Sequence, residues 1–309
     1  MNWFGVMPAM TTPFHPDLSV DHEMLAHHAE WLLENGCHGL VMLGSLGEGA
    51  TLEHDEKIAI LKTAVKASTA KGTPVVAAIS ALSTKSAVAL AKEAEQAGCS
   101  GLMVLPPYVY TSDWREMKEH VAAVINATKL PCMLYNNPVA YKTDFLAVQI
   151  AELAAECPNL QAVKESSADV RRVMAIREVA GDRLKIFVGV DDVLVEAVDA
   201  GATGWVAGLV NAFPRESVEL FELALAGKRK EAYALYEWFL PLLRMDTVPK
   251  FVQLIKWVQE ETNTGIARVR APRLELVGAE LAEAKAVLSK ALAARPTVTS
   301  TVFKALQEA

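Results

Sequence analysis

The sequence lacks the runs and spacings that mark several classes of protein. No apolar run reaches the roughly 18 residues of a transmembrane helix, and the start, MNWFGVMPAM, has neither the basic nor the apolar part of a secretory signal. Basic residues are not clustered and the formal net charge is −7, which argues against nucleic acid or an anionic membrane as a partner. We therefore expect a cytoplasmic protein that binds neither.

Cysteine is scarce and shows no pairing pattern. The four cysteines, at positions 37, 99, 132 and 157, have no CxxC spacing, which favours buried, reduced thiols. No stretch has the GxGxxG or P-loop spacing of a nucleotide site. The seven histidines fall mostly in predicted helices, so the sequence gives little support to a metal-dependent lyase, which stays open as an alternative.

One pattern is present eight times: a short apolar run, a loop and a helical stretch. The runs are nearly continuous in apolar character, which is typical of strands covered on both faces, and stretches such as 20–36 repeat apolar residues at helical spacing. Eight such units predict a (β/α)8 TIM barrel; a doubly wound open sheet, which uses fewer strands and a glycine-rich loop, is the alternative. The runs are FGVMPAM (4–10), GLVMLG (39–44), PVVAAI (74–79), GLMVLP (101–106), PCMLY (131–135), LQAVK (160–164), KIFVGV (185–190) and GWVAGLV (204–210).

The chain divides near residue 228. Residues 1–227 hold the eight units and form the predicted barrel, whereas residues 228–309 read as helices without strands. Two of these helices carry stripes of Trp, Phe and Leu, which favours an extension packed on the barrel or in a subunit contact. About the last dozen residues are expected to form a loose tail.

Polar residues follow the apolar runs, and in a TIM barrel the active site lies at these carboxyl ends of the strands. The most informative are Ser45, Tyr135 and Lys164, after the second, fifth and sixth runs. We expect these three side chains to converge on one mouth of the barrel. The other strand-end residues are Thr11, Thr12, Glu48, Ser80, Tyr108, Tyr110, Asp191, Asp192, Gly208 and Asn211.

This set suggests Schiff-base chemistry. A lysine amine condenses with a 2-oxo acid to give an iminium that accepts electrons, so that a nearby C–C or C–O bond breaks through an enamine. The amine must be neutral, and at the usual pKa of lysine only about one in 2,500 is neutral at pH 7, but burial lowers that pKa. Tyr135 would relay protons, and the loop GSLGE would hold a carboxylate with its Ser45 hydroxyl and backbone N–H groups.

Each residue also has a plainer interpretation. Lys164 could be a solvated charge, Tyr135 a packed ring beside a turn, and GSLGEG a glycine-rich turn. Asp191 or Asp192 could cap the following helix. The case for catalysis depends on the joint placement of several residues at different strand ends.

These residues are also where the chain resembles a known family. From residue 5 to about 278 it resembles the dihydrodipicolinate synthase / N-acetylneuraminate lyase family of class I Schiff-base lyases. GSLGE (44–48) is similar to the family's GxxGE carboxylate-binding loop, YNNP (135–138) to its catalytic-tyrosine motif, and VKES (163–166) to its Schiff-base lysine motif.

The resemblance implies roles for individual residues. Lys164 would be the nucleophile, Tyr135 the proton relay, and Ser45 with the Leu46 N–H the carboxylate site. Gly47, Tyr110 and Gly208 are expected to be further substrate-binding residues. The resemblance also implies a small-molecule 2-oxo acid or cyclic imine as substrate, no metal or organic cofactor, and a homotetramer built as a dimer of dimers.

Three positions depart from dihydrodipicolinate synthase itself. Leu46 stands where that enzyme has a second hydroxyl residue, and Ala140 where its arginine binds the second carboxylate of the substrate. Val109 interrupts its pair of adjacent tyrosines, which leaves open whether Tyr108 or Tyr110 joins the proton relay. The lysine-biosynthesis activity is therefore not expected.

Within the family, the three motifs look most like the branch that degrades 4-hydroxyproline, whose enzyme is Δ1-pyrroline-4-hydroxy-2-carboxylate deaminase. The alternative is an aldolase or dehydratase of 2-keto-3-deoxy sugar acids that uses the same lysine and tyrosine. Tyr141 and Lys142, just past the tyrosine motif, are read as part of a solvated loop. A barrel without catalysis, serving as a binding protein, is the alternative from another class.

Overall fold

Eight parallel strands form one sheet in the computed structural model of the protein, which describes residues 1–108, 110 and 112–298. The strands follow the order β1-β8-β7-β6-β5-β4-β3-β2, and a parallel bridge between Ala9 and Val41 brings the two ends of the sheet together. The predicted (β/α)8 TIM barrel is confirmed. The strands are β1 (Gly5–Pro8), β2 (Leu40–Met42), β3 (Val75–Ile79), β4 (Gly101–Val104), β5 (Cys132–Asn136), β6 (Leu160–Glu165), β7 (Lys185–Val188) and β8 (Gly204–Ala207).

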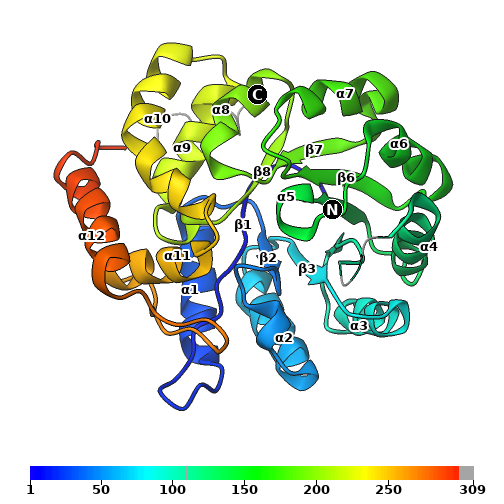
Figure 1. Ribbon diagram of the computed structural model, residues 1–309, viewed down its shortest axis with the longest axis horizontal. Helices are drawn as coiled ribbons and strands as arrows, with labels where there is room; N and C mark the ends of the chain where they lie inside the picture. The colour runs from blue at the N-terminus through cyan, green and yellow to red at the C-terminus, as the bar shows by residue number, and fades with distance from the viewer. Residues whose placement is uncertain (109, 111, 299–309) are drawn as a thin grey trace.

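Helices surround the strands (Figure 1). Several begin at side chains that cap free N–H groups: Asp21, Ser83 and Asp113 each accept a hydrogen bond from a backbone N–H three residues later. None of the helices that the structure describes is long and apolar enough to cross a membrane. They are α1 (His22–Glu34), α2 (His54–Thr69), α3 (Thr84–Gln96), α4 (Trp114–Ile125), α5 (Pro138–Tyr141), α6 (Ala147–Glu156), α7 (Arg171–Ala180), α8 (Leu194–Asp199), α9 (Pro214–Leu225), α10 (Arg229–Leu243), α11 (Phe251–Glu261) and α12 (Gly278–Ala293).

Short 3-10 turns follow several strands and helices. Their bounds are η1 (Gly49–Thr51), η2 (Gly181–Arg183), η3 (Asp191–Val193), η4 (Leu209–Asn211) and η5 (Arg244–Asp246). The eighth apolar run was expected to extend through residue 210, but β8 ends at Ala207 and the chain turns into η4. The turns η3, η4 and η5 bring polar groups together beyond the strand ends.

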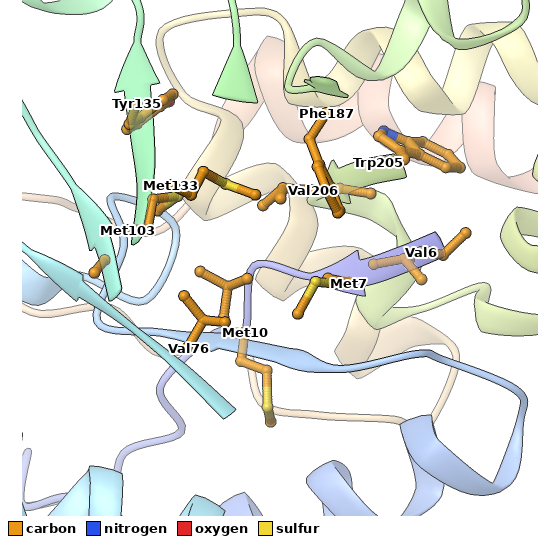
Figure 2. Close-up of a cluster of buried hydrophobic side chains, with 14 of the residues drawn as sticks. Val6, Met7, Met10, Val76, Met103, Met133, Tyr135, Phe187, Trp205 and Val206 are labelled. Atoms are coloured by element: carbon orange, nitrogen blue, oxygen red, sulfur yellow. The ribbon is translucent and has the colours of Figure 1, made fainter. Parts of the chain in front are cut away.

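The interior of the barrel is rich in methionine. Met7, Met103 and Met133 are fully buried among the strands, and Figure 2 shows them in one cluster with Phe187 and Val206. Flexible thioether side chains fill irregular space well, so the enclosed volume is packed. Polar side chains that could bind a substrate are therefore expected at the rim, where the strands end.

The C-terminal helices pack beside the barrel rather than apart from it. Helix α10 contacts α9 and α12, and α11 contacts η4 and η5; in Figure 1 they lie together at one side of the strands. The first of these helices, α10, begins at Arg229, next to the predicted division at residue 228, and that division into two parts stays a prediction. The expected loose tail lies almost entirely at residues 299–309, outside the described residues.

Candidate active site

Tyr135 and Lys164 lie side by side on neighbouring strands. Strands β5 and β6 pair in a register that sets Tyr135 directly opposite Lys164. The Lys164 Nζ lies 4.3 Å from the centroid of the Tyr135 ring, and each residue is only 6% exposed. Lys164 is thus not a solvated charge, and the plainer interpretation of this residue is wrong.

Burial also prepares Lys164 to react. It lowers the pKa of the amine to about 8, although the carboxyls of Asp246 and Asp191 act in the opposite direction. At that pKa about one lysine in ten is neutral at pH 7, compared with about one in 2,500 for a solvated side chain. Within the described residues, Nζ has neither a hydrogen-bond acceptor nor a salt-bridge partner. The amine is therefore available to an incoming carbonyl.

The Tyr135 hydroxyl is held as a proton donor. It accepts a hydrogen bond of 2.9 Å from Asn137 Nδ2, which leaves its own hydrogen available to another group. Burial raises the pKa of the phenol above its usual value, and the bond from Asn137 opposes this only in part. The phenol thus stays protonated at neutral pH beside the amine.

Gly189, which follows β7, makes room for the lysine. A Cβ atom at this position would lie 2.4 Å from Lys164 Cε and 2.0 Å from Ser166 Oγ, closer than unbonded atoms approach. Only glycine therefore lets the lysine side chain take its observed path to the rim. Nothing in the sequence around GVDD had indicated this requirement.

We expect Gly189→Ala to lower kcat/KM on the order of 100-fold, because a displacement of about 1 Å at a reacting group costs that much. Steady-state kinetics would measure the loss, and thermal unfolding followed by circular dichroism would show whether the barrel is intact. A variant with the kinetics of the natural protein would contradict the proposed packing of Lys164.

Tyr141 links Ser45 to Tyr135, which lies beside Lys164. The Ser45 Oγ and Tyr141 hydroxyl share a short hydrogen bond. The ring of Tyr141 packs edge-on against Tyr135, with centroids 5.8 Å apart, and lies 5.6 Å from the ring of Tyr108. The expected solvated loop is therefore wrong for Tyr141, which is half-buried, although Lys142 is exposed.

Of the two candidate relay tyrosines, Tyr108 lies in this cluster. Tyr110 is 57% exposed, and its predicted contact with substrate stays a prediction. Val109, which interrupts the tyrosine pair of dihydrodipicolinate synthase, lies outside the described residues. Tyr141 was missed as a site residue because the sequence does not show that helix α5 directs its ring back toward Ser45.

The loop GSLGE presents unused backbone donors. In the part of the chain that the structure describes, the N–H groups of Ser45, Leu46 and Gly47 make no hydrogen bond. Gly47 is packed so closely on the segment that follows β1 that a Cβ would lie 2.7 Å from the Met10 carbonyl oxygen. Glu48 follows with a φ of 54° and bends the chain into η1. Consecutive N–H groups of this kind can bind a carboxylate.

The Leu46 side chain is turned away from this loop surface. It is 3% exposed and packs in an apolar cluster with Val252, Ile255 and Val269, all from the C-terminal part of the chain. Any contact of Leu46 with substrate would therefore be made by its backbone. The predicted role of the Leu46 N–H in binding a carboxylate stays a prediction.

The buried Glu48 side chain fixes the GSLGE loop to the C-terminal part of the chain. Its carboxylate forms a salt bridge of 2.9 Å with Lys256 of α11, and the two side chains are 0% and 1% exposed. Lys256 also donates to the Thr12 carbonyl oxygen at 2.8 Å, and Glu48 accepts from the Arg270 N–H at 3.0 Å. The C-terminal segment thus supports the loop through buried charge.

Gly208 has a different environment from the one expected. Its N–H donates to the Asp191 carboxylate at 3.2 Å, and a Cβ on it would lie 2.1 Å from Asp246 Oδ1. The role predicted for Gly208 in binding substrate stays a prediction. What the structure places at this glycine is a pair of carboxyl groups, from η3 and η5.

Asp191 is not a helix cap. It is fully buried and accepts hydrogen bonds from Trp205 Nε1 at 3.0 Å and from the Leu209 N–H at 3.0 Å, in addition to Gly208. Burial raises its pKa to about 6, opposed by these donors and by Lys164. Among the described residues, no three His, Cys, Asp or Glu side chains are grouped so that they could hold a metal ion.

Comparison with known proteins agrees with this geometry. Residues 2–291 match the Dihydrodipicolinate synthetase family. The chain is 30% identical over 287 residues to 4-hydroxy-tetrahydrodipicolinate synthase of Desulforamulus reducens, covering 93% of this chain and 97% of that protein. It is 33% identical over 238 residues to the enzyme of that name from Rhizobium meliloti, covering 77% and 81%.

A solved structure gives the same result. The 4-hydroxy-tetrahydrodipicolinate synthase of Methylacidiphilum fumariolicum superposes with a TM-score of 0.91 at 28% identity, covering 94% of this chain and 97% of that one. The buried lysine and tyrosine thus occur on the fold shared by these enzymes. The chain belongs to the dihydrodipicolinate synthetase family and is a lyase of that family.

Proposed function

We propose that the protein is a Schiff-base lyase that acts on a 2-oxo acid or on the cyclic imine of one. The observation that carries this proposal is the buried Lys164 amine, with its lowered pKa, set directly beside Tyr135. A solvated or ion-paired lysine would not react in this way. The metal-dependent and non-catalytic alternatives give no reason for this arrangement.

The reaction begins with binding of the substrate carboxylate at the loop. The Ser45 hydroxyl and the N–H groups of Leu46 and Gly47 would hold the carboxylate, which brings C2 of the substrate to Lys164. The neutral amine adds to C2, and loss of water gives an iminium. Loss of a proton from C3 then gives an enamine, and a bond beyond C3 breaks as Tyr135 delivers a proton to the departing oxygen.

The best candidate activity is that of Δ1-pyrroline-4-hydroxy-2-carboxylate deaminase. Lys164 would attack C2 of the cyclic imine and open the ring, and the enamine would expel the 4-hydroxyl as water. Tautomerisation and hydrolysis would then release ammonia and 2-oxoglutarate semialdehyde. Support comes from Ala140, which offers no cation to a second carboxylate, and from the negative charges of Asp246 and Asp191, which act on Lys164. The relatives are named for a different reaction, so the identity of this substrate is part of the proposal and does not come from the comparison.

A sugar-acid aldolase or dehydratase is the second candidate. The observation that favours it is the presence of Asp191, Asp192 and Asp246 near the strand ends, since carboxylates accept hydrogen bonds from sugar hydroxyls. Both candidates use the same lysine and tyrosine. They differ only in which substrate tail the rim accepts.

The test is to trap the Schiff base. The protein would be incubated with pyruvate, with 2-keto-3-deoxy sugar acids, or with the cyclic imine made by oxidising 4-hydroxy-D-proline. Borohydride would then reduce any iminium, and mass spectrometry would map the adduct. We expect an adduct on Lys164, strongest with the cyclic imine, and release of ammonia when borohydride is left out.

Each outcome has a definite meaning. Strongest trapping by a sugar acid, without ammonia, would favour the second candidate. If none of the compounds gave an adduct on Lys164, the Schiff-base proposal would be contradicted altogether. The initial trapping rate should rise steeply with pH up to about 8, where half of Lys164 is neutral, and should level off above that pH.

A further inference from the structure

A second tyrosine holds the serine of the GSLGE loop. The Tyr141 hydroxyl and the Ser45 Oγ share a hydrogen bond, although the two residues are 96 positions apart in the chain. Within the described residues, this is the only hydrogen bond that the Ser45 side chain makes. The orientation of the Ser45 hydroxyl therefore depends on where the chain places Tyr141.

The chain fixes Tyr141 from two sides. Before it, Asn137 accepts a hydrogen bond from the Ala140 N–H at 2.9 Å with its side chain and one from the Tyr141 N–H at 3.0 Å with its carbonyl oxygen. After it, the buried Thr143 donates from its hydroxyl to the Pro107 carbonyl oxygen at 2.9 Å. The helical turn α5 is thus tied down at both ends, which holds the Tyr141 ring in place.

Asn137 also connects this turn to the tyrosine of the proposed reaction. Its Nδ2 donates to the Tyr135 hydroxyl at 2.9 Å, while its Oδ1 caps α5. The rings of Tyr135 and Tyr141 pack edge to face, with their planes 87° apart. One asparagine therefore contributes to the placement of both tyrosines and, through Tyr141, to that of Ser45.

The chemistry of the two hydroxyls favours Tyr141 as the donor. A phenol is a stronger acid than an aliphatic alcohol, so its hydrogen is the more readily shared. Burial raises the pKa of Tyr141, so the phenol keeps this hydrogen at neutral pH. When Ser45 accepts from Tyr141, its own hydrogen is free for a third group. Hydrogen bonds in a chain polarise one another, which makes Ser45 a better donor.

The third group that fits is an anion. In the part of the chain that the structure describes, the backbone N–H groups of Ser45, Leu46 and Gly47 make no hydrogen bond. A carboxylate bound to such consecutive N–H groups could also accept from the Ser45 hydroxyl, and hydrogen bonds to ionised acceptors are roughly twice as strong as neutral ones. The bond from Tyr141 leaves the serine ready to donate before a substrate arrives.

We propose that Tyr141 is a positioning residue of the substrate-binding site: it donates to the Ser45 Oγ and thereby directs the Ser45 hydroxyl to the carboxylate of a 2-oxo acid. The inference rests on the proposed function, which places the substrate carboxylate at the GSLGE loop. It adds that preference for an ionised carboxylate depends on a residue outside that loop. In this role Tyr141 affects how tightly the carboxylate is held rather than how fast the iminium forms.

The test compares a carbonyl compound that has a carboxylate with one that lacks it. Pyruvate and pyruvamide carry the same ketone and are similar in size, but pyruvamide is neutral. The full chain would be mixed with each compound and cyanoborohydride near the Lys164 pKa of about 8. The rate of adduct formation on Lys164, measured against concentration, gives a half-saturating concentration and a maximum rate. The natural protein should half-saturate at the lower concentration with pyruvate.

Tyr141→Phe removes the hydroxyl and keeps the ring contacts. It should raise the half-saturating concentration of pyruvate about 10-fold, the order expected for a hydrogen bond that acts on a charged group. The half-saturating concentration of pyruvamide and both maximum rates should change by less than about 3-fold, because a neutral amide is held by weaker bonds. Tyr233→Phe, the same change at an exposed tyrosine of α10, is the matched control and should alter none of these values.

The residue at position 45 shows whether Tyr141 acts through the serine. In Ser45→Ala, which has no hydroxyl, adding Tyr141→Phe should cost nothing further. In Ser45→Thr, which keeps the hydroxyl, adding Tyr141→Phe should again raise the half-saturating concentration of pyruvate about 10-fold. Thermal unfolding followed by circular dichroism would show that the barrel of each variant is folded.

The outcomes separate this inference from the function on which it rests. An unchanged half-saturating concentration of pyruvate in Tyr141→Phe would overturn the inference alone. So would an equal loss with pyruvamide, or a further loss in the Ser45→Ala background, since the hydroxyl would then not act on a carboxylate through the serine. If the natural protein formed no Lys164 adduct with either compound, the proposed function would be overturned and this inference with it.

Discussion

Lys164→Ala should abolish adduct formation with every 2-oxo acid and lower kcat on the order of 10⁴- to 10⁶-fold, the range found when a nucleophile is removed. The reason is chemical, since Lys164 is the amine that lies over the Tyr135 ring in the described part of the chain, and alanine has no amine to form the iminium. Turnover would be followed by release of ammonia or pyruvate, and the adduct by mass spectrometry of the reduced protein.

The matched control is Lys164→Arg. The guanidinium keeps the positive charge near Asp191 and Asp246 but stays protonated and cannot form a Schiff base. Binding of substrate should therefore persist while turnover is lost. If Lys164→Ala retained more than a few per cent of the rate, the nucleophile would have to be another residue.

Lys256→Met should lower the free energy of unfolding by about 3–5 kcal/mol, the cost of leaving one member of a buried ion pair without its partner. Glu48 would lose its salt bridge of 2.9 Å while remaining buried, and the Thr12 carbonyl oxygen would lose a donor. Methionine keeps most of the apolar part of the lysine side chain. The loss in free energy of unfolding therefore comes from the removed charge and not from a change in packed volume. Urea unfolding, followed by circular dichroism and by fluorescence, measures it.

The double variant Glu48→Gln with Lys256→Met supplies the control. Because it removes both charges, it should be more stable than Lys256→Met alone. With the Glu48→Gln single variant it completes a cycle in which the departure from additivity is the coupling of the pair. Additive losses in the two single variants would show that the ion pair contributes nothing. If the curves from circular dichroism and from fluorescence coincide for a protein, its unfolding is two-state and one free energy of unfolding describes it.

The barrel could be predicted because both faces of its strands are covered. Continuous apolar runs such as 74–79 and 160–164 occur where helices lie outside and packed side chains lie inside. Residue 208 marks the limit of this reasoning. The eighth apolar run continues to Val210 in the sequence. The chain nevertheless leaves the sheet at Gly208, whose N–H donates a hydrogen bond to the Asp191 carboxylate.

The centre of the site could be predicted for a similar reason. Lys164 and Tyr135 end neighbouring parallel strands, and neighbouring strand ends meet at one rim. Asp246 could not be found in this way, since it lies in a turn between two helices and its local sequence says nothing about the barrel mouth. Tyr141 was missed because its position depends on a single helical turn that begins at the Asn137 cap.

The support given by Glu48, Lys256 and Arg270 has a consequence for how the protein is made. A ribosome that has just completed β8 has already produced Lys164, Tyr135 and the GSLGE loop. The Lys256 ammonium and the Arg270 N–H that bind Glu48 of this loop are still untranslated. The nascent barrel thus carries the loop before it carries the charges that hold it, and the loop gains this support only after residue 270 has emerged and docked.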